Sequence, residues 1–90
     1  MSEGHPAFAW AQAAKHMGQL ARGEVRWEVY LEVQADSPHS PVRGRVHFVA
    51  GERHRASAWI FLEWSEKEIR ERFNDFSANE LWSLVESLSP

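Results

Sequence analysis

The chain has 90 residues, the length of one domain, and its five Trp, five Phe and one Tyr provide large rings for a small core. It contains no cysteine, which excludes disulfides, thiolate metal sites and a cysteine nucleophile. The formal net charge of −3 gives no overall attraction to nucleic acid, so any basic binding patch must be local.

The N-terminal region is predicted to be a frayed end followed by a helix. Residues 1–5 carry no basic stretch and precede no long apolar run, so we expect a frayed end rather than a signal peptide. Pro6 suits the first turn of a helix. Apolar residues then recur at helical spacing, at Trp10, Ala14, Met17 and Ala21. We therefore expect a helix over residues 7–22 that ends at Gly23.

Alternation of apolar and polar residues predicts a half-buried strand over residues 24–35. The apolar set is Val25, Trp27, Val29, Leu31 and Val33. The polar set, expected on the opposite face, is Glu24, Arg26, Glu28, Tyr30, Glu32 and Gln34. Residues 36–41 contain two prolines, and we expect them to form a loop that leads into an antiparallel neighbour.

Residues 42–64 are predicted to form a β-hairpin that turns at Gly51, where a positive φ carries no steric penalty. A two-residue loop would place Phe48 opposite Arg55 and set the apolar side of one arm against the polar side of the other. A three-residue loop pairs Phe48 with Ala56 and matches the apolar sides. We favour the three-residue loop because a shift of one residue turns every side chain to the other face.

The three-residue loop assigns the side chains of the second arm to faces. The side expected to face the core holds Ala56, Ala58, Ile60, Leu62 and Trp64. On the other side, Arg45 is expected opposite Trp59. Arg43 is expected opposite Phe61. A guanidinium over an aromatic ring adds about 0.5–1 kcal/mol at an exposed site, so this face would be both basic and aromatic.

A local pattern that occurs twice, an aromatic followed by Ser-x-x-Glu, predicts two helix starts, at Ser65 and Ser77. In each, the serine is the N-cap and the glutamate three residues later completes a capping box. We expect the first helix to end near Asn74 and the second to run to about Leu88. The apolar positions of these helices are Ile69, Phe73, Leu81, Leu84, Val85 and Leu88, with Trp82 at the edge.

These elements predict one α+β domain over residues 1–90, in the order α-β-β-β-α-α. It would consist of an N-terminal helix, a three-stranded antiparallel meander and two short C-terminal helices, with the strand 42–50 at the centre. In this arrangement Glu28 and Glu32 share a face with the arginines of the central strand and neutralise part of their charge.

The candidate binding site is the sheet face that combines arginines with aromatic rings. Its residues are Arg43, Arg45, His47, Arg55, Trp59 and Phe61, with Tyr30 on the neighbouring strand. Such residues are enriched at the centres of protein interfaces. They also hold single-stranded nucleic acid, by base stacking and phosphate contacts. The alternative is that a helix or a second subunit covers the rings while the glutamates pair with the arginines.

Patterns for catalysis, metal binding or cofactor binding are absent from the sequence. The histidine spacing matches neither HExxH nor a zinc finger, and His47 and His54 are expected on opposite faces. The charges of residues 66–75 mix signs at helical spacing, as on a solvated helix. There is no P-loop, nucleophile elbow or dinucleotide fingerprint. We therefore expect no catalytic residue, no metal and no cofactor.

The sequence favours a non-enzymatic protein-binding module, such as an adaptor, an inhibitor or a regulatory subunit. Its partner would be another protein or a second copy of the chain. Binding of single-stranded nucleic acid through the same face is the alternative, which the negative charge and the lack of an RNP-like motif disfavour. No run approaches the ~20 apolar residues of a membrane span, so we expect a cytoplasmic protein with no membrane partner.

Overall fold

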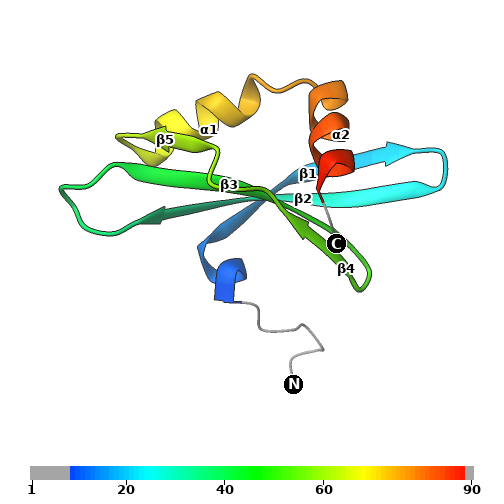
Figure 1. Cartoon of the computed structure of the whole chain (residues 1–90), viewed down its shortest axis with the longest axis horizontal. Helices are drawn as coiled ribbons and strands as arrows, with labels where there is room; N and C mark the ends of the chain where they lie inside the picture. The colour runs from blue at the N-terminus through cyan, green and yellow to red at the C-terminus, as the bar shows by residue number, and fades with distance from the viewer. Residues whose placement is uncertain (1–8, 89–90) are drawn as a thin grey trace.

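The computed structural model describes residues 9–88 as an antiparallel sheet with two helices on one face and a short 3-10 turn on the other (Figure 1). The predicted α+β class with an antiparallel sheet is confirmed. The frayed end expected at residues 1–5 lies outside the described residues. The elements are η1 (Ala9–Ala13), β1 (Ala14–Arg22), β2 (Val25–Ala35), β3 (Val42–Ala50), β4 (Arg53–Ala56), β5 (Phe61–Glu63), α1 (Glu66–Asn74) and α2 (Ala78–Ser87).

The strands form a meander with β3 at its centre, as predicted, and β1 is an additional strand beside β2. Strands β4 and β5 follow one another along the remaining edge of β3. The loops 23–24 and 51–52 connect β1 to β2 and β3 to β4. Gly23 and Gly51 open these loops with φ values of 61° and 64°, a conformation that glycine adopts without a steric penalty.

The predicted helix over residues 7–22 is wrong, because residues 14–22 are strand β1 and pair antiparallel with β2. Helix propensity amounts to less than about 1 kcal/mol per residue, and strand pairing overrides it. A β-bulge at Met17 explains the misleading spacing. The bulge adds one residue, so that Met17 and Leu20, three positions apart, both pack against the core. Gly18 beside the bulge has a φ of 145°.

The predicted three-residue hairpin loop is also wrong. The loop has two residues, and Phe48 lies opposite Arg55, as in the alternative that the sequence disfavoured. Arg55 does point to the helix side, where a polar residue was expected to be unfavourable. Its guanidinium lies 5.1 Å from the centre of the Trp27 ring, and Nη1 donates to the carbonyl oxygen of Val85 at 3.0 Å. This contact satisfies a carbonyl in the last turn of α2.

A bulge of two residues interrupts the second arm between β4 and β5. Between the pairs His47–Ala56 and Gly44–Phe61, β3 has two residues and the opposite segment has four, 57–60. Ser57 keeps this segment attached, since its N–H donates to the Val46 carbonyl and its Oγ accepts from the Val46 N–H. Two added residues leave the alternation of faces unchanged, so Phe61 points to the helix side as Arg55 does. It lies opposite Gly44 and is buried there.

Both helices pack on the sheet face that carries Trp27 and Phe48 (Figure 1). Both predicted helix starts are confirmed. The hydroxyls of Ser65 and Ser77 accept the backbone N–H three residues on, and Ser77 has the complete capping box. The buried core consists of Leu20, Trp27, Val29, Leu31, Val46, Phe48, Phe61, Ile69, Phe73, Leu81, Trp82 and Val85.

Close packing of α1 on β3 gives a first prediction, at Gly44. A Cβ added there would lie 2.7 Å from Cγ2 of Ile69, a side chain with 0% exposure. We expect Gly44→Ala to lower the free energy of unfolding by about 1–3 kcal/mol, because overpacking forces the neighbours to move. Urea denaturation measures the difference. In an Ile69→Ala background, which removes the clashing methyl, the same change should cost much less, and an equal cost would contradict this account.

Candidate functional site

The sheet face opposite the two helices is called the outer face below. Most of its side chains are polar or charged. Strand pairing places them in rows, since directly opposed residues point to the same side. One row contains His16, Tyr30 and His47, and a second contains Glu32 and Arg45. The outer face holds His16, Gln19, Glu28, Tyr30, Glu32, Gln34, Arg43, Arg45, His47 and His54.

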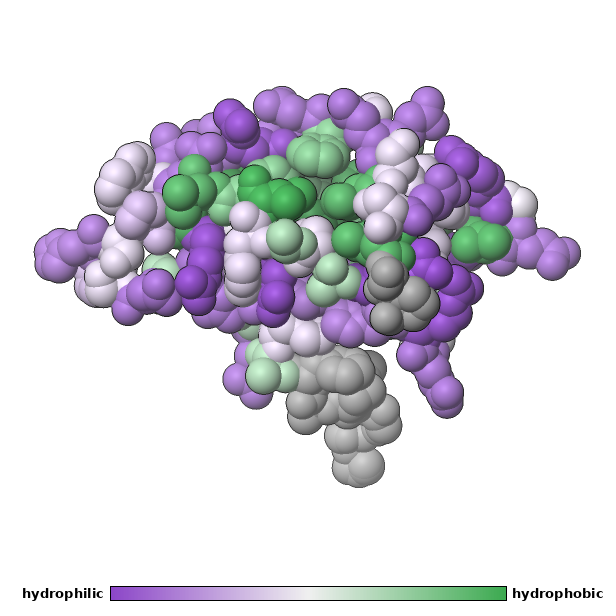
Figure 2. Space-filling model, viewed as in Figure 1, coloured by the Kyte–Doolittle hydropathy of each residue, from purple (hydrophilic) through white to green (hydrophobic). Residues whose placement is uncertain are grey.

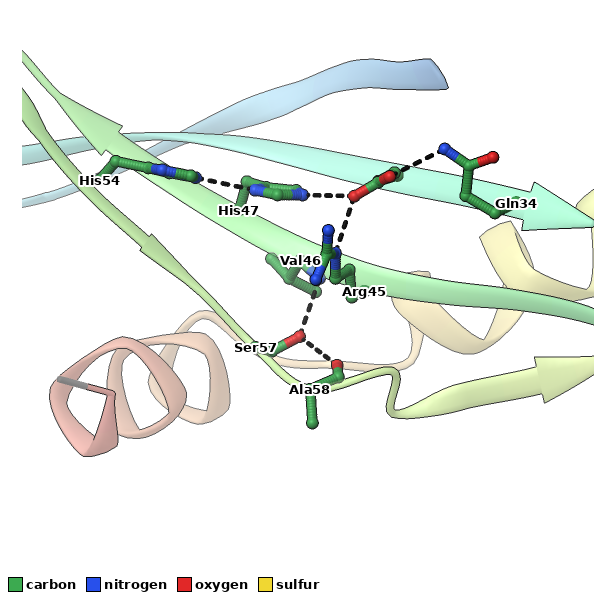
Figure 3. A network of polar contacts seen from close by, with 8 residues as sticks. Gln34, Arg45, Val46, His47, His54, Ser57 and Ala58 are labelled. Carbon is green, nitrogen blue, oxygen red and sulfur yellow. Dashed lines mark hydrogen bonds and ion pairs between the residues drawn. The ribbon is translucent and has the colours of Figure 1, made fainter. Parts of the chain in front are cut away.

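Glu32 accepts three hydrogen bonds at the centre of this face (Figure 3). Its Oε1 accepts from Nε of Arg45 at 2.8 Å and from Nε2 of His47 at 2.7 Å. Its Oε2 accepts from Nε2 of Gln34 at 2.9 Å. Nδ1 of His47 lies 2.8 Å from Nε2 of His54 on β4. We call these five side chains the Glu32 network.

Two members of the Glu32 network, Glu32 and His47, are shielded from water although they lie on the side away from the helices. Glu32 is 3% exposed and His47 is 1% exposed. Trp10 of η1 supplies the cover, because its ring stacks on His47 with the centres 3.9 Å apart and the planes 9° apart. The same ring lies 5.1 Å from that of His54 and meets Tyr30 edge-on at 5.5 Å.

Burial and hydrogen bonding shift the pKa values of the network in consistent directions. Burial by itself would raise the pKa of Glu32, but the hydrogen bonds from Gln34, Arg45 and His47 outweigh it and lower this pKa. Burial lowers the pKa of His47 and exceeds the opposite effect of Glu32. Burial, together with the charge of Arg45, also lowers the pKa of His54. Glu32 is therefore an ionised carboxylate beside two neutral imidazoles.

These charge states determine where the imidazole protons lie. A carboxylate only accepts hydrogen bonds, so the neutral His47 carries its proton on Nε2. Nδ1 of His47 is then an acceptor, and Nε2 of His54 carries the proton that joins the two rings. Both histidines are Nε2–H tautomers, and the hydrogen bonds run in one direction from His54 through His47 to Glu32.

Trp59 lies against the two arginines of the outer face. The guanidinium carbons of Arg43 and Arg45 are 4.8 and 4.2 Å from the centre of its ring. The predicted proximity of Arg45 and Trp59 is thus found, although Trp59 reaches the arginines from the bulge and not from a paired strand position. Arg43 also forms an ion pair with Asp36 at 3.3 Å. Each guanidinium is held between a carboxylate and the indole ring.

The two glutamates of β2, Glu28 and Glu32, have different hydrogen-bond partners. The predicted shared face of Glu28 and Glu32 with the arginines is confirmed by the strand register. Glu32 does pair with Arg45, but Glu28 binds His16 at 2.7 Å and Gln19 at 2.6 Å on β1. The positive charge of the face is therefore neutralised mainly through Glu32 and through Asp36 in the loop.

The structure brings most of the predicted site residues together on the outer face. These are Arg43, Arg45, His47, Trp59 and Tyr30. Arg55 and Phe61 lie on the helix face instead, because the two-residue loop reverses the expected faces of the second arm and the two-residue bulge does not reverse them again. Phe61 does not face Arg43. It packs edge-on against Phe76, with ring centres 5.8 Å apart.

The prediction that His47 and His54 lie on opposite faces is wrong, because the two-residue loop places them on one face and in direct contact. Reasoning from sequence also missed Trp10, whose segment was assigned to a helix. A usable signal exists in the dipeptide Gly-Glu, which occurs at 23–24 and 51–52 and opens both tight hairpin loops. It would have suggested that residues 14–22 form the first arm of a hairpin.

Comparison with known proteins finds no matching family model, no matching curated protein and no matching solved structure. Within residues 9–88, no cluster of three or more His, Asp or Glu side chains is arranged to hold a metal ion. The helices of the described part are too short to cross a bilayer.

The lowered histidine pKa values predict how stability depends on pH. In the unfolded chain His47 and His54 regain their ordinary pKa of about 6.5, so the unfolded state binds more protons as the pH falls below this value. We expect the free energy of unfolding to decrease between about pH 8 and about pH 5.5. The carboxylate of Glu32 contributes separately, at lower pH, because its stabilisation is lost only as the pH falls through its lowered pKa.

Urea denaturation at the two pH values measures this decrease. Replacing both network histidines, in His47→Gln/His54→Gln, should remove most of the pH dependence. The matched control is His16→Gln/His39→Gln, which removes two histidines outside the network and should retain it. An unchanged slope in the first variant would contradict the assignment.

Proposed function

We propose that the protein is a small, non-enzymatic protein-binding module that makes contact through the edge of the sheet at β5. This surface, the β5 edge, consists of Trp59, Ile60, Leu62 and Trp64. The observation that carries the proposal is exposure: Ile60, Leu62 and Trp64 are 43%, 66% and 71% exposed. Figure 2 shows a band of apolar surface along the seam between the helices and the edge of the sheet.

The origin of this exposure lies in the two-residue hairpin loop at 51–52. The sequence pattern predicts Ile60, Leu62 and Trp64 as core residues, but the shift in register gives the core position to Phe61. The three large side chains are turned outward on a strand that pairs only with β3. Contiguous exposed apolar groups on a small protein are typical of interaction surfaces, and Trp is enriched at their energetic centres.

Trp59 and Arg43 extend the surface toward the outer face. Arg43 lies directly opposite Leu62 in the strand pairing, and Trp59 covers its guanidinium. Because two arginines contact the ring of Trp59, this side chain loses little conformational entropy on binding, which favours a higher affinity. The engagement of Arg43 by Asp36 and of Arg45 by Glu32 supports a protein partner over nucleic acid, because phosphate contacts require available positive charge.

The experiment combines the solution mass from light scattering with photo-crosslinking from position 62. A dimer identifies the partner as a second copy, and a monomer with a crosslinked foreign chain identifies another protein. In either case, Leu62→Glu and Trp64→Ala should reduce association at least about tenfold, as expected for residues central to an interface. The matched control is Val25→Glu, because Val25 is also an exposed apolar strand residue (44%) and lies at the distant end of β2.

Two outcomes would overturn the proposal. One is a monomer that gives no crosslink from position 62 in extracts of its own cells. The other is binding of single-stranded oligonucleotides with an affinity that falls steeply with salt and depends on Trp59, since that result would identify nucleic acid as the ligand.

A further inference from the structure

We propose that the Glu32 network and Trp10 form an acid-sensitive latch, which holds η1 on the outer face and releases it when the His47–His54 pair takes up protons. Release of η1 would uncover the ring of His47 and the neighbouring Tyr30. The proposal concerns the outer face and does not depend on what binds the β5 edge.

The hydrogen bonds of the closed state require neutral histidines. His54 donates from Nε2 to Nδ1 of His47, and His47 donates from Nε2 to Glu32. One added proton leaves these bonds possible, because a single proton still lies between the two rings. A second proton does not, because a doubly protonated pair places two N–H groups against each other across 2.8 Å. The contact between the rings must then open.

The surrounding charges make even the first proton unfavourable. The carboxylate of Glu32 is already balanced by Arg45 at 2.8 Å. Glu28, the other carboxylate on this face, is bound to His16 and Gln19. A proton on the histidine pair therefore adds a positive charge beside a carboxylate that Arg45 already neutralises. Attraction to the face of the Trp10 ring offsets only part of this cost.

The charged groups described around the histidine pair come from three strands. Strand β2 contributes Glu32, Glu28 and Tyr30, and β3 contributes the cationic Arg45, with Arg43 two residues away and paired with Asp36. Strand β1 contributes His16, which is bound to Glu28. η1, with the sequence AWAQA, contributes no ionisable group. Both carboxylates of β2 are therefore already engaged in the closed state.

The segment that the latch holds is easily released. None of the residues of η1 is buried, and stacking of Trp10 on the two histidines attaches it to the sheet. η1 precedes β1 directly, and its departure leaves the strand pairs from residue 14 onward intact. Segments with so few buried contacts open at a lower free energy than the whole fold.

The test is a pH titration of the full chain from about pH 8 to about pH 5, followed by NMR. The indole N–H signal of Trp10, assigned with Trp10→Phe, and the ring signals of His47 and His54 should change with a shared midpoint. Amide exchange in residues 9–13, corrected for the intrinsic effect of pH, should increase about tenfold or more, while β2 and β3 stay protected. A Trp10 signal that stays constant while His47 titrates would overturn the proposal.

A variant separates the latch from a general effect of acid. His54→Gln keeps an amide N–H that can donate to His47 but does not titrate, so the Trp10 transition should disappear or move to lower pH. The control His16→Gln removes a histidine of the same face outside the network and should leave the midpoint unchanged. Should the Gln variant fail to fold, the wild-type titration alone decides. An unchanged midpoint in a folded His54→Gln protein would contradict the proposal.

Discussion

A two-residue hairpin loop and the bulge that follows it determine where the side chains of the second arm point. The segment 57–60 spans a distance that two residues span on β3, and Ser57 ties it to both backbone groups of Val46. Because side chains alternate along a strand, the two-residue loop sets Phe61 on the helix side, and two added residues leave it there. The irregular backbone of the bulge brings Trp59 to the arginines of the outer face. The core, the outer face and the exposed β5 edge follow from these two features.

The outer face contains a buried carboxylate, that of Glu32, which requires hydrogen-bond donors. Glu32 is shielded from water, and an unpaired charge there would be strongly unfavourable. Arg45, His47 and Gln34 each donate to it, and losing one of these donors would leave a buried carboxylate less well compensated. The N-terminal segment contributes by covering the network with Trp10. A segment at the chain end thereby becomes linked to the protonation of two histidines.

Local signals in the sequence account for the parts that were predicted correctly. The capping serines, Ser65 and Ser77, act within one helical turn, and their hydrogen bonds require no distant partner. Strand β2 alternates because one of its faces is buried, and its pattern shows this directly. The site was only partly predictable, because Arg43, Arg45 and His47 share a face of one strand, whereas His54 and Trp10 reach them through pairing and packing.

The sequence by itself determined the α+β class, the strands at 25–35 and 42–50 and the two capped helices, because each depends on interactions between near neighbours. The tertiary structure decided the state of residues 14–22, which have helical composition but gain backbone hydrogen bonds by pairing with β2. It also decided the hairpin register, because Arg55 finds the Val85 carbonyl and the Trp27 ring on the helix side, contacts that the apolar pattern does not show. The contact of His47 with His54 beneath Trp10 exists only once three segments have assembled.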